Sequence, residues 1–251
     1  MVKFLIYLLI GFLAQMIDGT MGMAYGVSCR TFLRTAAGVP GATASAVVHV
    51  SEVPTTLASG ISHLKMKNVN LSLLWKLMIP GVVGGVVGAY LLQNAGDRFE
   101  PFIDGYLILM GIVIIAKAFS KKEKAPREPG AYVFPLGLAG GFFDAAGGGG
   151  WGPIVTSTMV ATGHDVKRTI GTVNTAEFVV TLAETIAFIP TLVSQFREYL
   201  LIVLGLIIGG VAAAPVAAWA CKKLPVKALL IIVGALIACL NIWNLIKWFM
   251  G

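Results

Sequence analysis

Long apolar runs, separated by short breaks, constrain the fold of this chain more than any other feature. Ten such runs cover most of its 251 residues. Only 12% of the residues are charged and 57% are hydrophobic, whereas soluble domains carry roughly 25% charged residues. Such a chain has too few polar side chains to cover a globule in water. The sequence therefore predicts an all-α polytopic membrane protein.

The runs fall into two sets of five. Spanning the hydrocarbon core takes roughly 20 helical residues, so the last three runs of each set are long enough to cross alone. The first two runs of each set are short and are joined by glycine-rich segments, and the sequence leaves open whether these pairs span the membrane or re-enter it. The runs cover about 3–17, 23–36, 42–61, 69–92 and 101–119, then about 131–143, 153–162, 169–193, 199–221 and 226–249.

One charged segment, SKKEKAPREPG at 120–130, separates the two sets. It is the only stretch with so large a shift in composition. It divides the chain into a first membrane repeat, 1–119, a linker, 120–130, and a second membrane repeat, 131–251. Each repeat is expected to hold a short broken or re-entrant helix pair followed by three transmembrane helices.

The two glycine-rich joints, DGTMGMAYG and DAAGGGGWG, support a repeat because their rare residues align. A single offset brings the acids and the glycines of both joints into register, and one further residue of shift aligns polar residues of the third runs. The aligned pairs are Gly11 with Gly137, Asp18 with Asp144, Gly22 with Gly148, Gly26 with Gly152, His49 with Asn174 and Glu52 with Glu177.

An odd number of crossings in each repeat inverts the second repeat relative to the first. Lys and Arg gather in the linker and in the loops predicted on its side, 62–68, 163–168 and 221–227. Cytoplasmic loops of membrane proteins carry such an excess. The sequence therefore predicts a plasma-membrane protein with a cytoplasmic linker and both termini outside.

The joints predict an anion site. Helical backbone that breaks at membrane depth must line a cavity or be buried in protein, and glycine permits the turn. A helix that restarts after the break begins with unpaired N–H groups and the positive end of its dipole. With opposite orientations in the two repeats, both restarts can point at one central anion.

Ionisable residues inside apolar runs mark functional sites by default. Asp18, Glu52, Asp144 and Glu177 are such residues, and His49 precedes Glu52 by one helical turn. Carboxylates repel an anion, so we expect these acids to be protonated or to exchange protons, since burial disfavours their charged form. An alternative is that Asp18 and Asp144 cap the turns that follow them.

Four further ionisable residues in or near these runs are expected to have other roles. Arg30 and Arg34 are expected to extend to the outer head groups or to guide anions at the outer mouth. Asp104 is expected to be solvated. Glu184, whose equivalent position holds Ser59, is expected to be structural.

Several functions are excluded or disfavoured. The net charge of +7 lies in loops, which is typical of a membrane protein and does not indicate nucleic-acid binding. The three cysteines show no disulfide or metal-site spacing, and we predict no metal and no cofactor. GGGGWG lacks the Lys-Ser/Thr ending of a phosphate-binding loop, so the sequence does not indicate an enzyme. The N-terminal run has no clean cleavage site and is interpreted as structure, not as a signal peptide.

The stretches QMIDGTMGMAYG, GFFDAAGGGGWGP and HDVKRTIGTVNTAEF, with two apolar halves around a basic linker, resemble the TauE/SafE sulfite-exporter family of membrane permeases. The resemblance covers nearly the whole chain. It implies a permease for small sulfur-containing oxyanions such as sulfite or organosulfonates. The site that it implies comprises Asp18, Gly22, Gly26, His49, Glu52, Asp144, Gly148, Gly149, Gly152, Asn174 and Glu177.

The sequence thus favours a secondary transporter with a small anionic substrate in a lipid bilayer and alternating access at the repeat interface. The driving force is left open among the anion gradient, the membrane potential and protons, and homo-oligomerisation is left open too. The first rival is a cation or metal transporter that uses the buried carboxylates. The second is a membrane enzyme with His49 and Glu52 as an acid–base pair.

Overall fold

The structure, a computed structural model, describes residues 2–21, 23–65, 67, 69–119, 130–162, 164–194, 196–220 and 226–250. These residues form helices and turns, with no strand in any of the described ranges. The prediction of an all-α protein is confirmed. The elements are α1 (Val2–Met21), α2 (Tyr25–Ala37), α3 (Gly41–Lys65), α4 (Leu71–Ala95), η1 (Gly96–Phe99), α5 (Glu100–Lys117), α6 (Val133–Gly147), the π-helical η2 (Gly152–Thr156), α7 (Ser157–Ala161), α8 (Val166–Ala187), α9 (Ile189–Ser194), α10 (Phe196–Ala220) and α11 (Val226–Met250).

The helices follow the apolar runs closely, with two differences. Helix α1 has 20 residues and is about 30 Å long, so it is longer than the run that predicted it. The run 169–193 is interrupted at Phe188, where α8 ends and α9 begins. Pro190 explains the interruption, because proline is tolerated in the first turn of a helix but breaks a helix interior.

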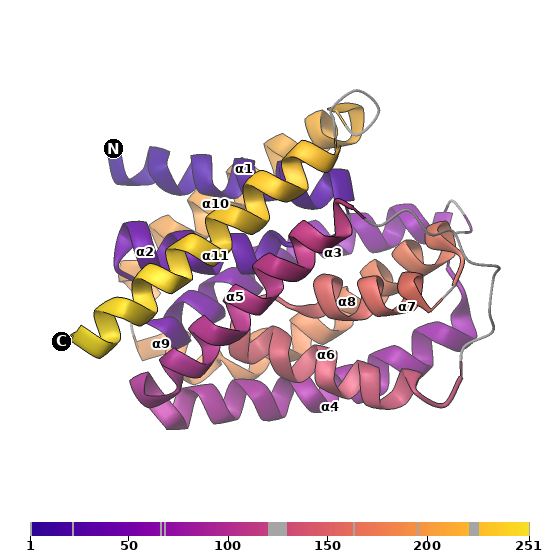
Figure 1. Cartoon of the computed structure of the whole chain (residues 1–251), viewed down its shortest axis with the longest axis horizontal. Coiled ribbons are helices and arrows are strands. Elements are labelled where there is room, and N and C mark those ends of the chain that lie inside the picture. The colour runs from indigo at the N-terminus through magenta and orange to yellow at the C-terminus, as the bar shows by residue number, and fades with distance from the viewer. Residues whose placement is uncertain are drawn as a thin grey trace.

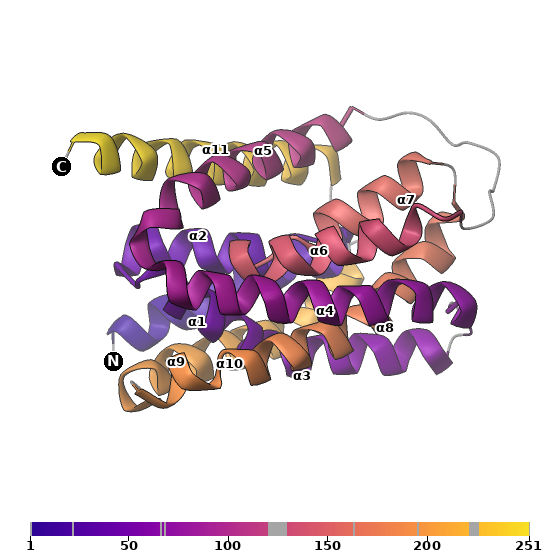
Figure 2. The same ribbon diagram turned by 90° about the horizontal axis from the view of Figure 1, so that it is seen from below.

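The helices form an elongated bundle with both chain termini at the same end (Figures 1 and 2). The short helices α2 and α9 lie toward that end, and α7 lies toward the opposite end in both views. Helices α2 and α7, which follow the two glycine-rich joints, therefore lie toward opposite ends of the bundle.

Helices from the two predicted repeats are interleaved. Helix α1 packs against α10 and α6 packs against α4, while α3 packs against α8 and α5 against α11. Glycines allow the closest approaches: a Cβ built on Gly11 would collide with the backbone of Leu206, and one built on Gly137 would lie 2.7 Å from the carbonyl oxygen of Leu77. The aligned glycines thus each contact a helix of the other predicted repeat.

The outside of the bundle is rich in exposed apolar side chains, as a lipid-facing surface requires. One helix among the described residues, Leu71–Asn94 within α4, has the length and mean hydropathy (1.6) of a membrane span. Shorter apolar helices are Val133–Gly147, Tyr199–Ala213 and Gly234–Met250. Exposed apolar residues include Leu5, Leu9, Ile79, Val83, Ile112 and Ile208.

Candidate functional site

The two helix breaks meet inside the bundle. A Cβ built on Gly26, in the first turn of α2, would lie 2.6 Å from both the carbonyl oxygen of Gly148 and the Cα of Gly149. Gly148 and Gly149 have φ values of 64° and 136°, and Ala24 before α2 has φ 82°. Such backbone favours glycine, so Gly148 and Gly149 are required by conformation, and Gly26 is required by close approach.

Asp144 caps the second break. Its Oδ1 accepts hydrogen bonds from the backbone N–H groups of Gly150 (2.6 Å) and Trp151 (2.9 Å). Asp18 is placed similarly at the first break, because its carboxyl group accepts a hydrogen bond from the backbone N–H of Tyr25. The capping alternative is therefore correct for Asp144, and two N–H groups expected to be free for a substrate have a partner within the chain.

A small cavity lies where the breaks meet. Its volume is about 10 Å³, which is room for about one water molecule and too little for a sulfur oxyanion. The cavity is lined by Ala24, Tyr25, Gly26, Val27, Glu52, Asp144, Gly149, Gly150, Gly152, Pro153 and Glu177.

Three carboxyl groups reach this cavity from three helices. Glu52 comes from α3, Asp144 from α6 and Glu177 from α8. Glu52 and Asp144 are buried, with 5% and 2% of their surfaces exposed. The sequence predicted these three acids for one site, and the fold brings them together.

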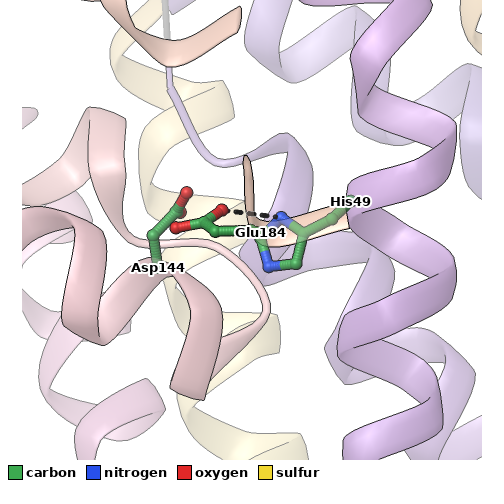
Figure 3. A group of neighbouring side chains, drawn as sticks. All are labelled: His49, Asp144 and Glu184. Carbon is green, nitrogen blue, oxygen red and sulfur yellow. Dashed lines mark ion pairs between the residues drawn. The ribbon is translucent and has the colours of Figure 1, made fainter. Parts of the chain in front are cut away.

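A fully buried histidine lies beside the cavity. His49 Nδ1 is 3.3 Å from Glu184 Oε2 and 3.8 Å from Glu52 Oε2, and the His49 ring stacks on Phe188 with centroids 5.8 Å apart. Figure 3 shows the side chains of His49, Asp144 and Glu184 converging. Glu184 thus belongs to the buried cluster beside the cavity, and the sequence analysis did not place it there. Its position inside an apolar run was the available signal.

The remaining predicted site residues are placed differently. Gly148 packs against the side chain of Arg30. Asn174 does not line the cavity, and its Nδ2 donates a hydrogen bond to Ser59 Oγ at 3.3 Å. Gly22 and most of the 120–130 linker lie outside the described residues.

The arginines of α2 do not extend to the head groups. Arg30 is fully buried, with its Nη2 3.3 Å from Glu100 Oε1, and Arg34 Nη2 lies 2.8 Å from Glu100 Oε2. Arg34 Nη1 also bonds Asp104, which is 1% exposed and not solvated as expected. These expectations were wrong because the partner acids lie on α5, far away in sequence.

A larger pocket, of about 390 Å³, adjoins this ionic group where α2 turns into α3. Arg34 and Glu100 line it, together with Trp248 of α11. Arg34 keeps 15% of its side chain exposed. The expectation that an arginine of α2 contacts arriving anions remains a prediction, and this pocket is where such contact would occur.

An apolar helical bundle with two helix breaks that meet at buried ionisable groups is the architecture expected of a membrane-embedded transporter. Residues 7–243 match the sulfite exporter TauE/SafE family. The chain is 40% identical over 255 residues to the probable membrane transporter protein YtnM of Bacillus subtilis (strain 168), an alignment that covers 98% of this chain and 84% of YtnM. No solved structure gives a significant match. The chain belongs to the TauE/SafE family, and it is a membrane transporter, not an enzyme.

Proposed function

We propose that this transporter moves small sulfur-containing oxyanions, with sulfite the first candidate, and that the cavity between the helix breaks is the closed form of its substrate site. The observation that carries the proposal is the contact of Gly26 with Gly148 and Gly149, because it joins the two breaks at one buried point. Substrate sites of secondary transporters lie at such interfaces between repeats.

The proposed mechanism is alternating access. The repeats are 1–119 and 131–251, and the exchange of α1 and α6 between them supports this division. Helices α2 and α7 lie toward opposite ends of the bundle, so displacing one of the two short helix pairs, α1–α2 or α6–α7, would open the cavity to one side only. The absence of a Cβ at Gly26, Gly148 and Gly149 keeps the contact between the two helix pairs free of side chains that would interlock.

The acids around the cavity must be neutral when an oxyanion enters. A protonated carboxyl group becomes an O–H donor, so Glu52 and Glu177 in that form would bind an oxyanion instead of repelling it. We therefore propose that substrate movement is linked to protons. In a cell that is negative inside, export of an anion is favoured by about 2.3 kcal/mol per charge per 100 mV.

Cation transport is the second candidate. The convergence of Glu52, Asp144 and Glu177 on one cavity favours it, because carboxylate oxygens are common cation ligands. In this alternative the carboxylates stay charged and the cation replaces the protons.

A flux assay separates the two candidates. Purified protein in liposomes should carry sulfite above the rate of empty liposomes, and a pH gradient should change that rate. Mn²⁺, measured in the same liposomes, should not move. Sulfite flux equal to that of empty liposomes, with Mn²⁺ flux above it, would replace the first proposal by the second.

A further inference from the structure

We propose that His49, Asp144 and Glu184 form a binding site for one divalent transition-metal ion. One ligand atom from each residue, a ring nitrogen and two carboxyl oxygens, lies within 4.8 Å of the others. The residues come from α3, α6 and α8, and Figure 3 shows their polar ends gathered at one point. This inference concerns a cation held beside the substrate cavity and does not depend on which substrate is carried.

The unmet hydrogen-bonding capacity of these groups points to a ligand. His49 and Glu184 are fully buried and Asp144 is 2% exposed. Five of their polar atoms form no well-aligned hydrogen bond with any described residue: both ring nitrogens of His49, both carboxyl oxygens of Glu184 and Oδ2 of Asp144. Buried polar atoms without hydrogen bonds are costly, and one cation would coordinate an atom of each of the three side chains.

Charge and donor type select the kind of ion. A neutral imidazole and two carboxylates carry a charge of −2, which a divalent cation balances in an apolar interior. Mixed nitrogen and oxygen donors suit zinc-type metals, whereas Mg²⁺ prefers oxygen ligands and retains waters. Ligand atoms around a tetrahedral zinc ion are about 3.4 Å apart, from bond lengths of about 2.1 Å. His49 Nδ1 and Glu184 Oε2 are already 3.3 Å apart.

Asp144 connects this metal site to the cavity. Its Oδ1 accepts the N–H groups of Gly150 and Trp151, while Oδ2 has no such partner. A cation bound by Asp144 and Glu184 would neutralise two acids next to the proposed oxyanion site. It would reduce the number of protons that anion binding requires.

The test is Zn²⁺ binding to the full chain, purified in detergent and stripped with a chelator. We expect one Zn²⁺ per chain by elemental analysis, an apparent melting temperature that rises with Zn²⁺, and no displacement by excess Mg²⁺. His49→Ala and Glu184→Gln should each weaken binding at least about tenfold, which corresponds to the loss of one ligand. His63→Ala, on the same helix as His49 but outside the cluster, should bind like the parent.

Melting curves without metal show whether each variant is folded. Folded Glu184→Gln that binds Zn²⁺ as tightly as the parent would overturn the proposal, and so would a parent protein without stoichiometric Zn²⁺. Sulfite flux through the parent protein in liposomes is measured separately. Flux above that of empty liposomes would uphold the proposed function even if Zn²⁺ did not bind, so a failure of this inference is distinct from a failure of the proposed function.

Discussion

At the scale of single residues, Asp144 is the most informative position in the chain. Its two carboxyl oxygens have different surroundings: Oδ1 holds the backbone of Gly150 and Trp151, and Oδ2 has no well-aligned hydrogen bond to the described residues. One side chain therefore fixes the shape of the break with one oxygen and places its second oxygen beside Glu184 and His49.

Substitutions of Asp144 should separate these two properties. Asp144→Ala leaves two buried N–H groups unpaired, at about 1–3 kcal/mol each, so it should lower the apparent melting temperature and abolish sulfite flux. Asp144→Asn keeps an amide oxygen for the cap, so it should melt close to the parent. It should still lose flux, because an amide cannot exchange the protons to which we propose that substrate movement is linked. Melting curves in detergent and flux in liposomes check both.

Asp165→Ala is the matched control. Asp165 also caps a helix, by accepting from Arg168 N–H at 2.7 Å, but it is exposed at the start of α8. It should cost about 1 kcal/mol and leave flux unchanged. Equal flux from Asp144→Asn and the parent would show that Oδ2 has no part in transport.

Much of the site was predictable from residues, and the rest was not. The alignment of Asp18 with Asp144 indicated two equivalent breaks, because acids and glycines are rare in apolar runs. Glu184 was missed because sequence spacing identifies neighbours on one helix, such as His49 and Glu52, whereas Glu184 reaches His49 across the contact between α3 and α8.

At the scale of elements, helix α2 is held by polar contacts to two other helices. Arg30 and Arg34 pair with acids of α5. Asn241 of α11 donates to Thr31 at 3.1 Å, and Asn244 donates to Thr35 at 3.2 Å. These contacts fix the helix whose first turn forms one wall of the cavity.

Removing the acid of the buried ion pair should destabilise this element. Glu100→Ala leaves the guanidinium of Arg30 buried with Ser45 as its remaining hydrogen-bond acceptor, and breaking a buried pair costs about 3–5 kcal/mol. The apparent melting temperature should fall strongly. The double variant Arg30→Met, Glu100→Leu should recover most of it, since apolar replacement of a buried pair is close to neutral.

Arg98→Ala, at an exposed arginine close to α5 in sequence, should change stability by no more than about 0.5 kcal/mol. If Glu100→Ala melts like Arg98→Ala, the pair does not hold α2.

Helix boundaries were predicted well because apolar runs, proline and glycine act locally. The packing partners were not predictable in the same way. The glycines of α1 and α6 indicated close approach, but only the fold shows that α1 approaches α10 and α6 approaches α4. The residues Arg30 and Asp104 were misplaced for the same reason, since their partners come from distant helices.

At the scale of the whole molecule, both termini lie at one end of the bundle. This agrees with the shared side predicted from loop charges, but the side of the membrane stays a prediction. A protease site inserted at 120–130 should be protected from added protease in intact cells, and one at the C-terminus should be cut. Cleavage at 120–130 with protection of the C-terminus would reverse the proposed orientation.

The most direct test of the account is sulfite flux through Gly26→Ala, measured beside Gly105→Ala in matched liposomes. A Cβ at Gly26 would press on Gly148 and Gly149, whereas one at Gly105 meets nothing within 4 Å. Overpacking of about 1–3 kcal/mol should cut flux through Gly26→Ala by about tenfold or more, while Gly105→Ala equals the parent. Equal sulfite flux through both variants would contradict a substrate site at the meeting of the two helix breaks.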